Sequence, residues 1–388
     1  MSNRLRPTPG PLTVFRHTAM ACDFEVALNE SQDEYGADAA LDALDEVDRV
    51  EEALSVFRST SAVSRLNLLG AEMGVRVDDE LWSWIETSMR LGEETEGAFD
   101  IASAPLWRVW GFANRDGEFP KEEDRQRALE LSGQRHLRLD PSARSIAFDE
   151  PGVELNFGAI GKGIALDLAA AKLEDRGVYN FLIQGGKSGA VARGGRIGDY
   201  SPSLFAEPTR DEEDEDPEFD EESGMRRRGA KVDSGAALDA LLSDALRPDA
   251  ALLAEAELRA APTGWTIGVA HPLFPKQRIG ELWLRDRALG TSGSTYQFFR
   301  AGGKRYSHII DPRTGFPTTG VLSTTVLAPT ATEADALSTA FFVLGPEKSE
   351  EYCRRRPDVS ALLVLERDVD PGYELAVFNL GSDIFRTL

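Results

Sequence analysis

The sequence predicts a mixed α+β protein. Its 388 residues exceed the usual size of a single hydrophobic core, so one large mixed domain or two packed ones are expected. Strand and helix candidates alternate irregularly along the chain, without the spacing of a dinucleotide-binding fold, and no repeat of fixed period is present. The composition, with 41% hydrophobic and 28% charged residues, is ordinary for a globular protein.

Helix and strand candidates alternate irregularly in both halves of the chain. Apolar residues recur at helical spacing over 33–57, and a glycine-rich turn opens another apolar helix near residue 160. In the first half we expect a strand at 24–28, helices at 33–57 and 80–91, a hairpin over 137–148, a helix at 160–173 and a buried strand at 181–183. In the second half we expect a strand at 265–270, strands or turns at 287–293, 306–310 and 323–327, a helix at 334–344, and closing strands at 362–365 and 375–379.

An acidic segment interrupts the chain between these halves. Ten of the twelve residues 211–222 are Asp or Glu, and three arginines follow at 226–228. Such blocks repel themselves and cannot bury a core, so disorder is expected here, whereas 235–261 regains an Ala- and Leu-rich helical character. We interpret 202–261 as an acidic, partly disordered insertion within a domain that spans 12–388, and a solvated loop is favoured over a partner-binding role.

Charge and composition exclude several classes of function. The net charge of −23 argues against nucleic acid as a partner and against docking on anionic membranes, because both need a surplus of Lys and Arg. Two cysteines are too few for a disulfide framework or a Cys-rich zinc site. The four histidines show no paired metal-ligand spacing.

The start of the chain carries no recognisable targeting signal. Residues 1–11 are polar and proline-rich, and no apolar stretch of the kind that a secretory signal requires follows them. No apolar run is long enough to span a bilayer. The chain as given is therefore expected to be cytoplasmic without membrane insertion, or periplasmic if a leader has been removed.

A glycine-rich turn, Asn156-Phe-Gly-Ala-Ile-Gly-Lys-Gly163, opens the helix expected at 160–173. Glycines let the backbone approach a ligand closely, and a helix N-terminus offers N–H groups and positive potential. Lys162 stands where it could reach an anion. The spacing is not that of a Walker A loop, and a turn of this kind can also serve packing alone.

Polar residues crowd the segment Ser307-His-Ile-Ile-Asp-Pro-Arg-Thr-Gly315, where a short strand is expected to run into a turn. His308 alternates with apolar neighbours, so its side chain is expected to point away from that of Ile309. A neutral imidazole near a reacting hydroxyl could serve as a general base. From the residues alone, a structural histidine bonded to Asp311 or to the backbone is the favoured alternative.

Asp335 and Thr339 lie four residues apart in Glu333-Ala-Asp-Ala-Leu-Ser-Thr-Ala340 and share one face of the predicted helix. The rest of this helix is small and apolar. A carboxylate and a hydroxyl near a phosphate-binding turn would suit a hard cation such as magnesium. A role for Asp335 as a cap or dipole partner near the helix start explains it equally well.

A fourth polar position is Asp100, at the end of Gly97-Ala-Phe-Asp100. Its carboxylate could accept hydrogen bonds from a ribose or from the edge of a cofactor ring. The aromatic-rich segment 106–112 follows, and such aromatic residues are more typical of core packing than of a cofactor cage.

Together these segments resemble the FAD:protein FMN transferase family, also called ApbE-like. The resemblance runs from about residue 15 to the last turns and is interrupted by the acidic insertion. Eight motifs occur in the order in which the family has them, so chance is a poor explanation. They are Met20; Ser61-Ala-Val-Ser-Arg-Leu-Asn67; Gly97-Ala-Phe-Asp100; Gly158-Ala-Ile-Gly-Lys-Gly163 with Asp167; Gly185-Gly186; Thr291-Ser-Gly293; His308-Ile-Ile-Asp-Pro-Arg-Thr-Gly315; and Asp335 with Thr339.

The resemblance implies a two-lobed architecture related to the T-fold, with the flavin site between the lobes. It implies transfer of FMN from FAD to a Thr or Ser hydroxyl in a short motif of an acceptor flavoprotein, with release of AMP. Magnesium would be held by the backbone oxygen of Ala159 and the side chains of Asp335 and Thr339, and His308 would be the base. The FAD site would be lined by Met20, Phe57, Ala98, Phe99, Asp100, Asn156, Lys162, His308 and Ile309.

Several positions depart from the pattern that the family usually shows, and two other functions stay open. If water entered in place of the hydroxyl, the same site would be an FAD pyrophosphatase that yields FMN and AMP. A non-catalytic FAD-binding protein is the other alternative, against which the intact Asp335, Thr339 and His308 argue. The departures are Ala21 and Cys22 where Gly and Thr are usual, Phe57 for Tyr, Asn156 for Asp, Lys187 for a polar amide and Ser294 for Asp.

Overall fold

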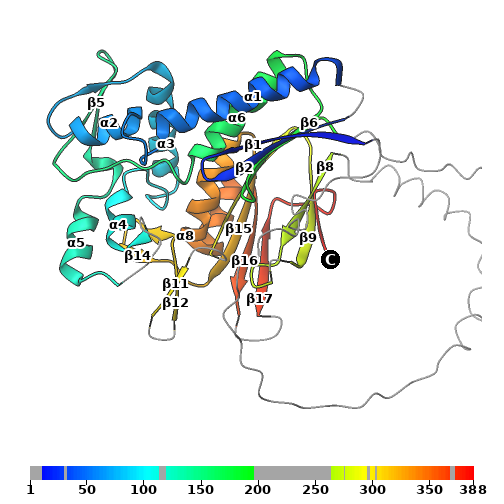
Figure 1. The fold of residues 1–388 in the computed structure, drawn as a ribbon. Coiled ribbons are helices and arrows are strands. Elements are labelled where there is room, and N and C mark those ends of the chain that lie inside the picture. Colours follow the sequence, from blue (N-terminus) through cyan, green and yellow to red (C-terminus); the bar gives the residue numbers. More distant parts are fainter. Residues whose placement is uncertain are drawn as a thin grey trace, which may run out of the picture. The chain divides into compact units, whose positions relative to one another are not determined.

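The computed structural model describes residues 11–29, 33–112, 119–195, 264–274, 276–294, 298–301, 304–367 and 372–388. Helices and strands are mixed throughout these ranges, which confirms the predicted α+β class (Figure 1). The insertion expected at 202–261 lies outside them, and its extent stays a prediction. Within the described ranges, no helix combines the length and the apolar character that a membrane span requires.

An eight-stranded sheet forms the centre of the larger lobe (Figure 1). Every neighbouring pair in it is antiparallel. Segments far apart in the sequence meet in it, because a strand from the first half of the chain pairs with one that follows the predicted insertion. In spatial order the strands are β1 (Leu12–Ala19), β2 (Cys22–Asn29), β6 (Phe181–Gly185), β7 (Gly189–Arg193), β10 (Arg287–Gly293), β15 (Val321–Ala328), β16 (Ser360–Glu366) and β17 (Tyr373–Phe378).

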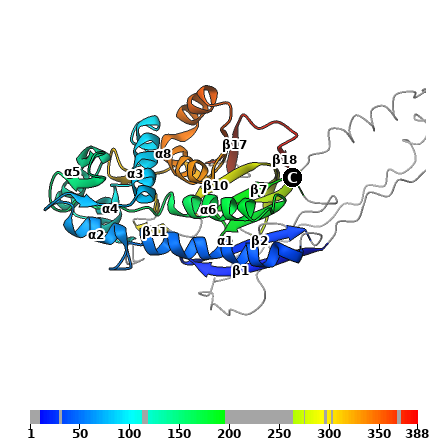
Figure 2. The same ribbon diagram turned by 90° about the horizontal axis from the view of Figure 1, so that it is seen from above.

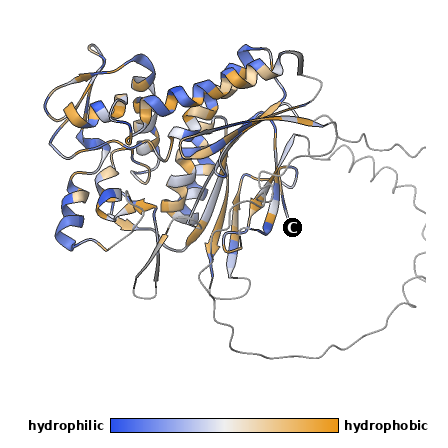
Figure 3. Ribbon diagram, viewed as in Figure 1, coloured by the Kyte–Doolittle hydropathy of each residue, from blue (hydrophilic) through white to orange (hydrophobic). Residues whose placement is uncertain are grey.

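Both faces of the central strands of this sheet are buried. Alternate residues of β6 show this directly, since Phe181 and Ile183 belong to one apolar cluster and Leu182 to another. Strands of this kind are continuous apolar runs rather than alternating ones, and Figure 3 shows apolar residues along the central strands and the helices beside them. One face packs against α1 (Asp33–Leu54), α6 (Gly161–Asp175) and α8 (Ala331–Arg355), and the other against the sheet of β18 (Phe385–Thr387), β9 (Arg278–Leu284) and β8 (Trp265–Ala270).

The smaller lobe is built from helices, which Figure 2 shows at one side of the molecule, and from a small three-stranded sheet. Ser61 and Asp78 begin two of these helices by accepting a backbone N–H at 2.9 and 2.8 Å. Trp82 and Ile85 are buried in the same apolar cluster as the helical face of the large sheet, so the two lobes share one core. The elements are α2 (Ala62–Leu69), α3 (Asp79–Glu94), α4 (Ala104–Val109), α5 (Glu122–Glu130), a 3-10 turn (Gln134–His136), and β3 (Val75–Arg76), β4 (Leu137–Asp140) and β5 (Ser145–Phe148).

The strand or turn expected at 306–310 is divided in the structure. One hairpin ends at Ser307, the next begins at Ile310, and the backbone of Ile309 is turned toward other partners. Its N–H donates to Ser307 Oγ at 3.1 Å, and its carbonyl accepts from Thr318 N at 3.0 Å. The hairpins are β11 (Phe298–Ala301) with β12 (Lys304–Ser307), and β13 (Ile310–Asp311) with β14 (Phe316–Pro317).

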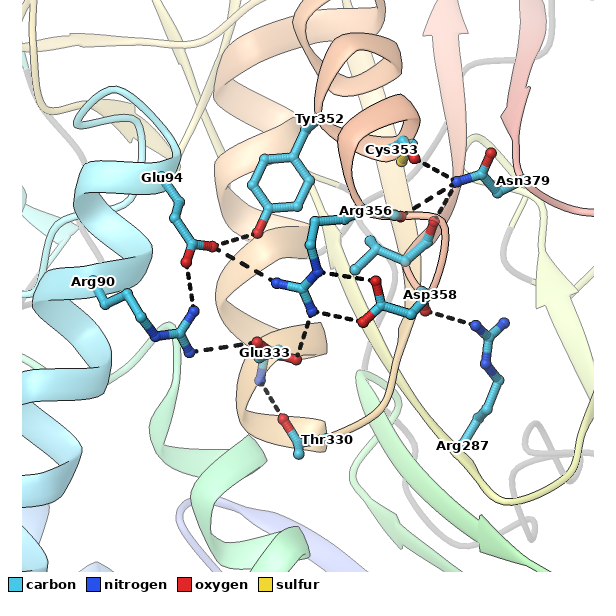
Figure 4. A network of polar contacts seen from close by, with 11 residues as sticks. Arg90, Glu94, Arg287, Thr330, Glu333, Tyr352, Cys353, Arg356, Asp358 and Asn379 are labelled. Atoms are coloured by element: carbon cyan, nitrogen blue, oxygen red, sulfur yellow. Dashed lines mark hydrogen bonds and ion pairs between the residues drawn. The ribbon is translucent and has the colours of Figure 1, made fainter.

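The long helix α8 is bent where the sequence predicts its end. Gly345 has φ 75°, which is left-handed backbone that favours glycine, and Pro346 follows as the first residue of the second helical segment. The expected helix at 334–344 is therefore confirmed as the first segment. Because of the bend, the end of the second segment returns toward the first turn of α8 (Figure 4).

An ion-pair network holds this arrangement and joins α3 to both segments of α8 (Figure 4). Arg356, which follows α8, contacts Asp358 at 2.7 Å, Glu333 of the first turn at 3.5 Å and Glu94 of α3 at 3.9 Å. Tyr352 donates to Glu94 at 2.7 Å. Burial acts to raise the pKa of Glu94, but the Tyr352 hydroxyl and the neighbouring guanidinium groups bring it below its ordinary value. The carboxylate is thus kept charged where the lobes meet.

Two glycines let α8 approach α6 and the sheet closely. A Cβ on Gly163 of α6 would lie 2.3 Å from the carbonyl oxygen of Ala331. A Cβ on Gly290 of β10 would lie 2.3 Å from the carbonyl carbon and oxygen of Ala334. These atoms belong to backbone and cannot rotate away, so any larger residue would force the elements apart.

We expect Gly163→Ala to lower the free energy of unfolding by about 3 kcal/mol, because its Cβ would overlap the α8 backbone. Gly161→Ala is the matched control, since a Cβ there would lie 3.6 Å from the nearest atom, in ordinary contact with Leu54. That control should change stability by less than about 1 kcal/mol. Urea unfolding of both variants checks this, and equal stabilities would contradict the close approach.

Candidate functional site

The predicted glycine-rich turn is held in place before α6 begins. Asn156 donates its N–H to the carbonyl of Ile101 at 2.7 Å, and its side-chain oxygen accepts the N–H of Gly158 at 2.8 Å. Ile160 has non-helical backbone and no side-chain cap. The helix therefore starts at Gly161, and Lys162 lies in its first turn, as the sequence predicts.

Helices α6 and α8 cap each other. Asp335 Oδ2, on α8, accepts the N–H of Gly163 at 3.1 Å. In return Asp167, on α6, accepts the N–H groups of Ala331 and Thr332 at 2.7 and 2.8 Å. Burial raises the pKa of Asp167, and the hydrogen bonds from Thr332 and Ala331 oppose this. Each helix thus supplies the acceptor for N–H groups that the other leaves free.

The cap at the start of α8 itself is another residue, Thr330, whose hydroxyl accepts the N–H of Glu333 at 3.2 Å. Asp335 therefore does not cap its own helix. It is 5% exposed, and its second carboxylate oxygen has no hydrogen-bond partner among the described residues. A buried carboxylate with one fixed and one available oxygen is suited to a cation or a polar ligand.

Hydroxyl groups gather beside this carboxylate. Thr339 Oγ1 lies 2.9 Å from Ser292 Oγ of β10, and Ser292 Oγ lies 2.8 Å from Ser338 Oγ. Ser338 in turn donates to the carbonyl oxygen of Asp335 at 2.8 Å. The predicted ligands Asp335 and Thr339 are thereby linked through a strand residue that the sequence analysis gave no role.

The turn between β1 and β2 reaches the same place. Met20 and Ala21 have φ 50° and 57°, and Met20 packs partly buried against the core. The next residue, Cys22, lies in the electrostatic field of both Lys162 and Asp335. Burial raises the pKa of its thiol, and the positive charge of Lys162 opposes this. Cys22, which follows this turn, is therefore within electrostatic reach of Lys162 and Asp335, and the place of Met20 in the FAD site stays a prediction.

Asp100 is bound mainly by backbone. Its Oδ1 accepts the N–H of Ala102 at 2.7 Å and its Oδ2 that of Gln134 at 2.9 Å. Burial raises its pKa, and these two N–H groups act in the opposite direction. The carboxylate thus shapes the segment 100–102, whose Ile101 carbonyl accepts the N–H of Asn156, and a direct contact of Asp100 with flavin stays a prediction.

His308 lies between the two hairpins, half-buried, with its ring edge-on to Phe112 at a centroid distance of 6.4 Å. The carboxylate of the nearby Asp311 accepts from the Arg313 N–H at 2.9 Å and from its Nε at 2.8 Å. The stem of Arg313 also lies beside Gly97, where a Cβ would be 3.7 Å from its Cγ. The loop that carries His308 therefore adjoins the segment 97–100.

The remaining predicted residues differ in how far their side chains are exposed to solvent. Ala98 and Phe99 are 1% and 2% exposed and belong to the core, so they could meet a ligand mainly through their backbone. Phe57 lies beyond the end of α1 with 79% of its surface exposed. Leu54, at that end of α1, lies close to Gly161 of the glycine-rich turn. Phe57 thus follows a helix end close to the glycine-rich turn, and its place in the lining of the FAD site stays a prediction.

Sequence reasoning missed three polar residues that organise this region: Ser292, Ser338 and Gln134. Ser292 stands in the Thr291-Ser-Gly293 motif, which could have pointed to it. Ser338 is separated from Ser292 by 46 positions, so their contact has no local signal. Within the described part of the chain, no three His, Cys, Asp or Glu side chains are grouped as metal ligands. The predicted magnesium site needs one carboxylate, a hydroxyl and a carbonyl.

The fold and these contacts define an α+β protein in which α6 starts at a glycine-rich turn. Its partner helix α8 carries the buried carboxylate of Asp335 and the hydroxyl of Thr339. The chain belongs to the ApbE family, whose model matches residues 20–202 and 242–363. It is 27% identical to the FAD:protein FMN transferase of Escherichia coli (strain K12) over 329 residues, which are 83% of this chain and 76% of that protein. It is 29% identical to the FAD:protein FMN transferase of Treponema pallidum over 81% of this chain and 73% of that protein.

Solved structures share the fold. The ApbE protein of Thermotoga maritima aligns with a TM-score of 0.71 and 23% identity over 95% of this chain and 97% of that one. The flavin transferase ApbE of Vibrio cholerae aligns with a TM-score of 0.69 and 21% identity over 95% and 98%. These alignments confirm the predicted ApbE-like architecture.

Proposed function

We propose that this chain is an FAD:protein FMN transferase that moves FMN from FAD to a Thr or Ser hydroxyl of an acceptor protein and releases AMP. The observation that carries the proposal is that Asp335, linked to Thr339 through two serines, accepts the Gly163 N–H in the first turn of α6, the turn that also carries Lys162. A helix N-terminus with a lysine suits the pyrophosphate of FAD. The names of the relatives, FAD:protein FMN transferase, support the same reaction.

The donor set fits a magnesium ion. The carboxylate of Asp335, the hydroxyl of Thr339 and the backbone carbonyl of Ala159 are all oxygen ligands, which hard cations prefer. Asp335 is already oriented by the Gly163 N–H and retains a second oxygen. When bound, magnesium would supply Lewis-acid stabilisation of the charge that develops on the pyrophosphate.

The chain's own residues would carry out the rest of the reaction. The acceptor hydroxyl oxygen attacks the phosphorus of the FMN half. The bond from that phosphorus to the bridging oxygen breaks, and this oxygen leaves with AMP. A ring nitrogen of His308 takes the hydroxyl proton, while Lys162 and the N-terminus of α6 stabilise the negative charge on the phosphates.

Mass spectrometry of a protein acceptor tests this function. A candidate flavoprotein with a threonine-containing motif is incubated with the enzyme, FAD and magnesium, and AMP is measured in parallel. We expect an adduct heavier by one FMN moiety, with one AMP for each adduct. Free FMN and AMP without any adduct would instead assign FAD hydrolysis, and intact FAD would assign a binding protein.

We expect Asp335→Ala to abolish magnesium-dependent FAD turnover, with a loss of at least about 100-fold because a ligand is removed. Asp335→Asn is the matched variant, since its amide oxygen can still accept the Gly163 N–H. Asp335→Asn should lose as much FAD turnover as Asp335→Ala. Only Asp335→Ala should also lose the hydrogen bond to the Gly163 N–H, a loss that lowers the free energy of unfolding by about 1 kcal/mol. Turnover against magnesium concentration and urea unfolding separate the two effects. Full FAD turnover by Asp335→Asn at an ordinary magnesium concentration would contradict the assignment of Asp335 as a magnesium ligand.

We expect His308→Ala to slow FMN transfer by about a hundred to ten thousand-fold, the usual contribution of a general base. FAD affinity should change far less, because the base acts on the acceptor hydroxyl. Single-turnover transfer and fluorescence titration of FAD measure the two quantities. Lost affinity with an unchanged transfer rate would refute the role of base.

A further inference from the structure

The hydroxyl groups beside Asp335 form a chain of hydrogen bonds with one possible direction. The chain runs from Thr339 to Ser292 at 2.9 Å, from Ser292 to Ser338 at 2.8 Å, and from Ser338 to the carbonyl oxygen of Asp335 at 2.8 Å. Ser338 is fully buried, so no solvent competes for its hydroxyl. The chain links the two residues predicted to bind the cation.

The carbonyl at one end fixes where each hydrogen goes. A carbonyl can accept and cannot donate, so Ser338 gives its single hydroxyl hydrogen to Asp335. Ser338 can then take part with Ser292 only as an acceptor, and Ser292 gives its hydrogen to Ser338. Ser292 in turn accepts from Thr339. The hydrogen of Thr339 therefore points to the strand, and its remaining oxygen lone pair is directed elsewhere.

We propose that Ser292 and Ser338 are positioning residues that hold the Thr339 hydroxyl as an acceptor, with its oxygen ready for a divalent cation. The proposal rests on the function above, because it assumes that Thr339 is a cation ligand. Neither serine needs to touch the cation. When the hydrogen of a hydroxyl is already donated to a neighbouring residue, the oxygen is oriented to accept a cation. A freely rotating hydroxyl would first have to lose rotational freedom when the cation binds.

Ser338 makes the proposal specific, because it does not act on Thr339 directly. If Ser338 is replaced by alanine, the hydrogen of Ser292 is released and can be donated to Thr339. The hydroxyl of Thr339 is then free to turn its own hydrogen toward the cation site. A role in packing alone predicts no such effect, since alanine fills nearly the same volume and favours the helix.

The neighbouring strand offers a matched control. Thr324 of β15 stands directly opposite Ser292 in the antiparallel register, so both side chains lie on the same face of the sheet. Thr324 is fully buried, and its hydroxyl has no hydrogen-bond partner among the described residues. Thr324→Val thus removes a hydroxyl at the same depth that is not part of the chain.

The experiment measures binding of Mn²⁺, as a stand-in for Mg²⁺, by electron paramagnetic resonance of the FAD-saturated full-length protein. Ser292→Ala and Ser338→Ala are each expected to weaken Mn²⁺ binding by about 10-fold or more, the usual effect of a residue that orients a metal ligand. The double variant should be little weaker than either single one, because both break one chain. Thr324→Val should bind Mn²⁺ as the unmodified protein does, and FAD affinity without metal should stay unchanged in all variants.

Wild-type Mn²⁺ affinity in Ser338→Ala would overturn the proposal, even if Ser292→Ala were weakened. Equal weakening in Thr324→Val would also overturn it, because the effect would then come from any change at this depth. Thermal unfolding confirms that each variant is folded, and Ser338→Ala decides the matter alone if Ser292→Ala does not fold. An unmodified protein that binds no Mn²⁺ and transfers no FMN would instead refute the proposed function.

Discussion

The arrangement of the site depends on the reciprocal capping of α6 and α8. Asp335 closes the first turn of α6, and Asp167 closes the first turn of α8. Because each cap belongs to the other helix, neither helix can slide along its partner without freeing buried N–H groups, and each such group costs about 1–3 kcal/mol. Gly163 brings the two backbones close enough for these bonds. The glycine-rich turn and the polar face of α8 are therefore fixed in one register.

The same turn of α8 is held from its other side by the charged network in Figure 4. Glu333, two residues before Asp335, contacts Arg90 of the smaller lobe at 3.4 Å and Arg356 at 3.5 Å. These are partly exposed pairs, and each alone would contribute little. They stabilise the structure together, because one network joins α3, the start of α8 and the residues that follow its second segment. The carboxylate of Asp335 thus lies in a turn that is fixed by both lobes.

Local patterns predicted the parts of the site that lie within one element. The spacing of Asp335 and Thr339 placed them on one helix face, and the glycines before Lys162 located the start of α6. Contacts between distant segments gave no such signal. The links of Asp167 to Ala331 and of Ser292 to Ser338 join residues 164 and 46 positions apart. The short helices α2, α4 and α5 were not predicted, because six to nine residues carry too little periodicity to be recognised.

Charge explains why the proposed reaction needs a cation in this particular chain. The protein carries a net charge of −23, so its overall field repels an anionic substrate such as FAD. The start of α6 and Lys162 provide positive electrostatic potential. The negative charge of Asp335, which accepts the N–H of Gly163, lowers this potential. A carboxylate repels a nearby pyrophosphate, and a bound divalent cation would offset this repulsion. In the proposed function Asp335 therefore weakens the binding of the pyrophosphate when the cation is absent, and the cation strengthens that binding.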